Sequence, residues 1–257
     1  MTKLIFIEGV SGTGKTTTAK RLAERLIGNG YKTAVYLEFD YRNPIDFYST
    51  AVLSKEEYQK ICNEYTEYLS DIDNNTIDAG DMYLVRYYDS DTPLFEKPLM
   101  DRFWQSEFCY NPPNPISLNK YTRVYESVWK NFALSLNGEY DYIIFDASLI
   151  RHPISDMTRN YSADGVQAAQ HIKALLGALG DTERFVFYLK TDNIDQKLRK
   201  AHNDRNQTPP TDEDIRFWER VYKTDTFVID RIDESVKVYN VSECEYDDVL
   251  NDIVKRI

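Results

Sequence analysis

The sequence is poor in cysteine and histidine and has no long apolar run. Its three cysteines, Cys62, Cys109 and Cys244, lie far apart, and none belongs to a C-x-x-C pair. This spacing gives no zinc site and fits a reducing compartment, so we expect a cytoplasmic protein. No apolar run approaches the ~20 residues that a helix needs to span a membrane. Because an apolar segment already begins at Lys3, we expect no signal peptide and no membrane partner.

Positive charge is also scarce. The 257 residues carry 42 acidic and 31 basic side chains, which gives a net charge of −11. Proteins that bind a nucleic-acid backbone need basic surfaces, so we expect no nucleic acid as a partner. A nucleotide remains compatible with this charge, because one loop can supply local positive potential. The length suits a single α/β domain over residues 1–257, and the sequence leaves open whether it forms a homodimer.

The chain is organised around residues 3–28. The run Lys3–Ile7 is short, apolar and rich in branched and aromatic residues, which predicts a buried strand. Apolar residues at helical spacing follow Lys15, and Gly28 ends that pattern. Between the two segments, Gly9–Thr16 matches G-x-x-x-x-G-K-[ST]. A strand, this motif and a helix in succession predict a phosphate-binding loop.

The residue types in this loop suit a nucleoside triphosphate. Its glycines permit positive φ and keep side chains away, so that backbone N–H groups can converge on an anion at a helix N-terminus. Lys15 is expected to reach the β- and γ-phosphates, and the Thr16 hydroxyl to hold Mg²⁺. The predicted cofactors are therefore ATP and Mg²⁺. The predicted nucleotide-binding residues are Gly9, Ser11, Gly12, Thr13, Gly14, Lys15, Thr16 and Thr17.

Two acids follow the second predicted strand, Thr33–Leu37. In doubly wound sheets, ligands bind beyond the carboxyl ends of the strands, so Glu38 and Asp40 would lie beside an acceptor. One of them could take a proton from the acceptor as a general base. Alternation along an extended strand would place both on one face, so either could serve. A solvated acidic loop is the alternative interpretation.

A second strand–acid pattern spans Tyr142–Asp146. Four apolar residues followed by an acid resemble a Walker B strand, in which the acid holds Mg²⁺ directly or through water. We therefore predict Thr16 and Asp146 as the metal-binding residues. His152, beside Pro153, is interpreted as a structural or surface histidine in a turn, because no metal-ligand spacing surrounds it.

Residues 41–135 read as a long, mostly helical insertion that forms the acceptor site. Ser54–Glu57 has the form of a capping box and predicts a helix to about Ser70. A second helix is predicted over Ser117–Leu136, where apolar residues recur on one face. Met82–Tyr88 is compatible with a strand or a helix.

Four charged residues are candidate acceptor ligands. Arg102 and Glu107 belong to the insertion, although each is also explained as a surface charge. Arg151 and Arg159 follow the strand that ends at Asp146 and could hold an anionic acceptor. No spacing distinguishes among the four.

A basic helix end followed by a break predicts a lid over residues 199–215. The helix that begins after Asp192 carries Arg199 and Arg205, and Asn206–Pro210 ends it. Arginines on such a lid can neutralise charge that develops on a transferring phosphoryl group. Each arginine is also compatible with an ordinary exposed helix charge.

Together these segments resemble the P-loop nucleoside and nucleotide kinases, especially the thymidylate-kinase-like branch. Phe6–Thr17 carries the closest match, and over the whole chain the sequence is similar to a bacterial group of such proteins of undefined substrate. The resemblance implies a three-layer P-loop NTPase fold with a parallel sheet. It departs from the branch at Ser11, where an acid is usual, and at Glu38–Arg42, which replaces an Arg-Glu-Pro. It therefore implies ATP and Mg²⁺, but not thymidylate.

The sequence favours an ATP- and Mg²⁺-dependent enzyme that transfers the γ-phosphoryl group to a small-molecule acceptor. The acceptor could be a nucleoside, a nucleotide or another hydroxyl compound. The alternative is a nucleotide-hydrolysing switch or regulatory P-loop NTPase without such an acceptor. A GTP switch needs Asp-x-x-Gly, but Asp146–Leu149 has no glycine, and Leu189–Asp192 lacks the first residue of the guanine motif.

Overall fold

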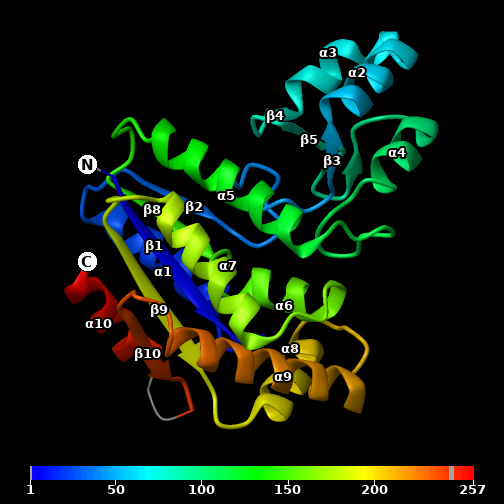
Figure 1. Ribbon diagram of the computed structural model, residues 1–257. Helices are drawn as coiled ribbons and strands as arrows, with labels where there is room; N and C mark the ends of the chain where they lie inside the picture. The colour runs from blue at the N-terminus through cyan, green and yellow to red at the C-terminus, as the bar shows by residue number, and fades with distance from the viewer. Residues whose placement is uncertain (1, 243–245) are drawn as a thin grey trace.

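The computed structural model describes residues 2–242 and 246–257 (Figure 1). Cys62 and Cys109 are buried free thiols, whereas Cys244 lies outside the described residues. Within the described ranges, no helix combines the length and the apolar character that crossing a membrane requires.

A parallel five-stranded sheet forms the centre of the molecule, in the order β10-β9-β1-β8-β2. Its strands are β1 (Lys3–Gly9), β2 (Thr33–Tyr36), β8 (Tyr142–Asp146), β9 (Arg184–Lys190) and β10 (Val236–Asn240). From β1 the chain runs to the edge strand β2, and from β8 it crosses β1 to reach β9. The chain thus changes direction about β1, and this switch point opens a crevice at the carboxyl ends of the strands.

Helices cover both faces of the sheet, which confirms the predicted α/β class and its three layers (Figure 1). Residues of β1 alternate between the faces: Ile5 and Ile7 pack with α1 and α10, and Leu4 and Phe6 pack with α5, α7 and α9. The layer helices are α1 (Lys15–Gly28), α5 (Leu118–Ser135), α7 (Gly165–Ala178), α9 (Asp212–Ile229) and α10 (Tyr246–Arg256). Two further helices, α6 (Arg151–Asn160) and α8 (Ile194–Asp204), follow the carboxyl ends of β8 and β9.

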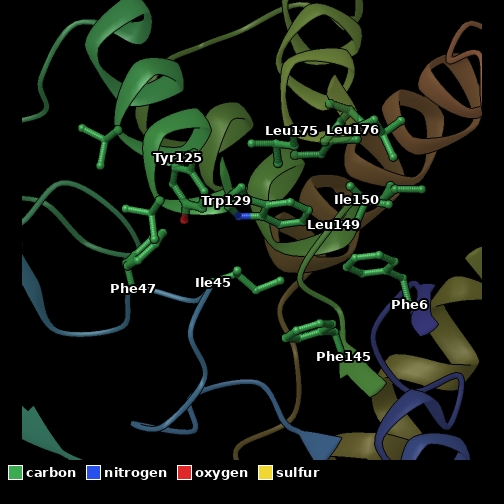
Figure 2. Close-up of a cluster of buried hydrophobic side chains, with 14 of the residues drawn as sticks. Phe6, Ile45, Phe47, Tyr125, Trp129, Phe145, Leu149, Ile150, Leu175 and Leu176 are labelled. Atoms are coloured by element: carbon green, nitrogen blue, oxygen red, sulfur yellow. The ribbon is translucent and has the colours of Figure 1, made fainter. Parts of the chain in front are cut away.

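The larger core lies between the sheet and α5 (Figure 2). The Phe6 ring is stacked on both Trp129 and Phe145, with ring centroids 5.8 and 5.4 Å away. All three side chains are fully buried. Burial of each such side chain contributes about 2–3 kcal/mol. The apolar face predicted for Ser117–Leu136 is the face that this core buries.

Most of the regular structure in the insertion is helical, but the insertion also contains an antiparallel sheet with its own small core, which was not predicted. Residues 50–104 form a lobe that stands apart from the central sheet (Figure 1) and begins with β3. Its elements are β3 (Thr50–Ser54), α2 (Lys55–Glu64), a 3₁₀ turn (Thr66–Tyr68), α3 (Leu69–Asn74), β4 (Thr76–Asp78), β5 (Met82–Arg86), β6 (Tyr88–Asp89), β7 (Thr92–Pro93) and α4 (Lys97–Trp104). The capping box at Ser54 is present, but its helix ends at Glu64.

Candidate active site

The segment between β1 and α1 folds into a tight loop in which several amides have no backbone partner among the described residues. Gly9, Gly12 and Gly14 have φ of 133°, 82° and 88°. Among the described residues, no backbone acceptor pairs with the amides of Gly12, Gly14, Lys15 or Thr16. No side chain caps α1, and its first turn contains no acid. A helix N-terminus with free N–H groups and no internal anion is suited to an external one.

Lys15 is buried at the mouth of this loop. Its Nζ donates to the carbonyl oxygen of Val10 at 3.2 Å, and the Thr13 hydroxyl donates to the same oxygen at 2.7 Å. Burial lowers the pKa of the Lys15 ammonium, and the nearby Asp146 carboxylate opposes that shift. An ammonium with so little water around it is positioned to gain from an incoming anion.

Thr16 and Asp146 lie together where β8 ends beside α1. The Thr16 hydroxyl donates to Asp146 Oδ2 at 2.5 Å. Asp146 Oδ1 is buried without a hydrogen-bond partner, and burial raises the pKa of this carboxyl group. Within the described residues, no group of three His, Cys, Asp or Glu side chains surrounds a metal position. One hydroxyl and one orphaned carboxylate oxygen nevertheless suit Mg²⁺, which keeps several waters and takes other ligands from phosphates.

A buried acid outside the predicted set, Glu8, links the loop to the next element. Its carboxylate accepts hydrogen bonds from the amides of Leu149 and Arg151, each at 2.8 Å. Burial raises the pKa of Glu8 to about 7, although these amides favour the charged form. Because Glu8 immediately precedes Gly9, this contact fixes the start of α6 relative to the phosphate loop.

A cleft of about 380 Å³ adjoins the loop at the carboxyl ends of β1, β2 and β8. Lys15, Arg151, Arg159 and Arg205 bring positive charge to its lining, and Glu38 and Asp156 bring acids. The cleft thus joins the predicted phosphate loop to a second, strongly cationic wall. A larger hollow of about 910 Å³ includes Thr2 and lies at the opposite ends of the strands, so it is remote from this chemistry.

The two candidate bases occupy different positions. β2 ends at Tyr36, and Phe39 has a φ of 65°, so the extended alternation predicted to place Glu38 and Asp40 on one face is wrong. Glu38 lines the cleft with Lys15, whereas Asp40 lines only a neighbouring hollow that Glu38 shares. Asp40 instead accepts two hydrogen bonds from the Arg42 guanidinium, at 3.2 and 3.1 Å.

Three further residues predicted for the acceptor site or the lid are not part of the cleft lining. Arg199 is exposed on α8 and donates to Asp195 at 2.6 Å, whereas Arg205 at the end of that helix reaches the cleft. Arg102 is exposed on α4 in the lobe (Figure 1). Glu107 is buried and accepts a hydrogen bond from the Tyr87 hydroxyl.

Sequence reasoning identified Arg151 and Arg159 but missed the rest of the inner wall of the cleft, which α6 forms with an aromatic residue of the insertion. His152 lies in the first turn of α6 and stacks on Tyr110, with ring centroids 4.1 Å apart. Asp156 accepts the Tyr110 amide at 2.9 Å, and the Tyr110 hydroxyl donates to Asp46 at 2.8 Å. The available signal was helical spacing: residues 151, 152, 155, 156 and 159 all line the cleft.

Comparison with known proteins does not identify a family for this chain. No protein-family model matches the chain, and no curated protein matches it. Among solved structures, the chain is similar to the YorR protein of Bacillus subtilis, solved in complex with phosphorylated GDP. The TM-score is 0.46 and the sequences are 13% identical, with 98% of this chain and 94% of that chain covered. The functional assignment therefore rests on the residues of the site itself.

Proposed function

We propose that the protein is a P-loop kinase that transfers the γ-phosphoryl group of ATP to a small-molecule acceptor. The observation that carries this proposal is the shared cleft: Lys15 of the loop faces the same space as Glu38, Arg151, Arg159 and Arg205. A switch or regulatory NTPase has no need of a second, charged wall opposite its phosphates. A phosphotransferase needs one to bind and orient the acceptor.

The loop forms the donor end of the proposed site. Free amides between Gly12 and Thr16 bind the phosphate oxygens, and Lys15 neutralises charge at the β- and γ-phosphates. Thr16 and Asp146 would hold Mg²⁺, which when bound supplies electrostatic stabilisation of the phosphate oxygens. Because Lys15 and Asp146 are both buried, their charges act in a medium that screens them poorly.

The opposite wall forms the acceptor end. Glu38 accepts the acceptor's proton as the acceptor oxygen bonds to the γ-phosphorus, and the bond from that phosphorus to the β–γ bridging oxygen breaks to release ADP. Arg205 lies at the end of α8 in the predicted lid and stabilises charge on the transferring group. Arg199 takes this role only if the lid rearranges, since it now pairs with Asp195.

Incubation with γ-labelled ATP, Mg²⁺ and a pool of metabolites tests the proposal. Label in a small organic product is the expected result, and Lys15→Ala should abolish both ATP binding and transfer. Lys20→Ala, which removes an exposed lysine from the same helix, is the matched control and should leave both unchanged. Label that appears only as free phosphate with every pool would contradict the kinase assignment and favour a hydrolytic switch.

A further inference from the structure

Two arginines of the cleft are held by neighbouring aromatic residues of α9. Arg151 Cζ lies 3.6 Å from the centroid of the Trp218 ring, and Arg159 Cζ lies 4.8 Å from that of Phe217. The Phe217 and Trp218 rings contact each other edge to face, with centroids 4.7 Å apart. Phe217 and Trp218, which are consecutive on α9, thus contact the guanidinium groups of two α6 residues that lie eight positions apart.

This stacking fixes the orientation of a guanidinium but leaves its N–H groups unsatisfied. A ring covers one face of the planar group, whereas the N–H bonds point outward in the plane. Arg151 is 5% exposed, and its Nε is buried with no hydrogen-bond partner among the described residues. A buried cation without a counter-ion is costly, so its retention in a cleft points to a ligand that supplies one.

Among the described residues, no carboxylate is in direct contact with these arginines. Within the part of the chain that the structure describes, no acid lies within 4 Å of Arg151, Arg159 or Arg205. Asp225 and Glu38 act on Arg151 only from beyond that distance. Asp225 Oδ2 accepts the Tyr188 hydroxyl at 2.6 Å, whereas its Oδ1 has no hydrogen-bond partner among the described residues and makes no direct contact with Arg151.

We infer that Arg151 and Arg159, held by Trp218 and Phe217, form a subsite for an anionic group on the acceptor, a phosphate or a carboxylate. A guanidinium presents two parallel N–H donors to two oxygens of such a group, which matches either anion. The inference rests on the proposed function only in calling this ligand the acceptor. Trp218 and Phe217 are positioning residues, since they act through the arginines.

Isothermal titration calorimetry without ATP tests the subsite independently of catalysis. The probes are phenyl phosphate, benzoate and phenol, which share a ring and differ in charge. They are titrated into Lys15→Ala, in which the phosphate loop has lost its ammonium group and competes less for anions. We expect at least one anionic probe to bind and phenol to bind much more weakly; the preferred anion identifies the group. Equal binding of phenol, or no anion binding in this variant, would overturn the inference.

Variants in the same background locate the binding. Arg151→Gln should weaken the anion about 10- to 100-fold, the range for a lost charge-assisted hydrogen bond. Arg159→Gln, at an exposed position, should weaken it as well and covers the case in which the buried variant does not fold. Arg220→Gln removes an exposed charge from α9 and should change nothing. Unchanged binding in a folded Arg151→Gln and in Arg159→Gln would refute the subsite.

The positioning role of Trp218 is tested by a separate measurement. Trp218→Leu should weaken the anion about 3- to 30-fold, as expected for a lost cation–π contact, whereas Trp218→Phe should keep most of the affinity. In the enzyme with Lys15 intact, Trp218→Leu should raise the acceptor KM and leave the ATP KM unchanged. Equal affinity in the Leu and Phe variants would contradict the role. If the kinase screen fails but anion binding is intact, the proposed function is refuted and the anion subsite is not.

Discussion

The structure separates two acids that the sequence could not distinguish, so replacing each tests the acceptor end directly. Glu38→Gln and Asp40→Asn each remove one negative charge while nearly preserving shape. Glu38 lines the cleft beside Lys15, whereas Asp40 lines a neighbouring hollow and pairs with Arg42. Only the first replacement should therefore affect the transfer step.

The expected magnitudes differ widely. A positioned general base typically contributes 10²- to 10⁴-fold to turnover, so Glu38→Gln should lower kcat by about that factor. Asp40→Asn loses only a contact with Arg42, whose side chain is 78% exposed, and such pairs are worth about 0–1 kcal/mol. Partial burial raises the pKa of Asp40, but the hydrogen bonds from Arg42 outweigh it and leave the pKa below its ordinary value. This environment is unsuitable for a base, so kcat should change less than about 5-fold.

Single-turnover transfer of label from γ-labelled ATP to the acceptor measures this step without product release. ATP affinity and the thermal midpoint should match those of the unmodified chain in both variants, which confirms that the donor end and the fold are intact. A loss of turnover in Asp40→Asn equal to that in Glu38→Gln, or normal turnover in Glu38→Gln, would refute the assignment of the base.

Three further perturbations test the metal site, the loop and the buried core. Asp146→Asn should raise the Mg²⁺ concentration needed for ATP binding at least about 10-fold, measured by Mg²⁺ titration. Gly9→Ala would place Cβ 2.1 Å from the Leu189 carbonyl oxygen and should lower the free energy of unfolding in urea by about 2 kcal/mol or more. Burial lowers the pKa of His171 to about 3. Its unfolded form binds the proton below pH 6.5, so stability should fall by up to about 1.4 kcal/mol per pH unit as the pH falls from 6.5, and His171→Gln should lose that slope.

Each of these predictions has an outcome that would contradict it, and Gly9→Ala also has a matched control variant. Gly30→Ala shares the positive φ but meets no atom within 4 Å, so it separates backbone strain from overlap. A Gly9→Ala variant no less stable than Gly30→Ala would contradict the tight pairing of β1 with β9. For His171, a slope that persists in the variant would assign the acid sensitivity to another group. An unchanged Mg²⁺ requirement in Asp146→Asn would remove that carboxylate from the metal site.

The central elements could be predicted because their signals are local. The strand–loop–helix at residues 3–28 and the strand ending at Asp146 depend on short motifs and on the periodicity of apolar residues. α5 shows the same kind of signal over a long window, and its predicted apolar face is the buried face. In each case neighbouring residues in the sequence share the environment that decides their conformation.

The lobe and the inner wall of the cleft depend on partners far away in the sequence. β3 is short, and it pairs with β5, which lies about thirty residues later in the chain. Nothing within Thr50–Ser54 alone identifies that pairing. α6 was read as a turn because of Pro153, yet a proline in the first helical turn loses no intrahelical hydrogen bond. The sequence therefore identifies Arg151 and Arg159 as candidate ligands, but not the helix that brings His152, Ser155 and Asp156 to the same wall.

Glu8 shows how one such long-range contact shapes the whole site. The buried Glu8 carboxylate accepts hydrogen bonds from the backbone at the start of α6. Its own strand, β1, leads directly into the phosphate loop. This one side chain therefore helps to set the distance between Lys15 and Arg151. Because burial raises its pKa to about 7, its favourable contribution to folding is complete below pH 4.5 and declines as the pH rises through 7. Glu8 thus connects the phosphate loop, which begins directly after it, to the start of the helix that carries Arg151 and Arg159, the two parts of the chain that the proposed function assigns to the donor and the acceptor.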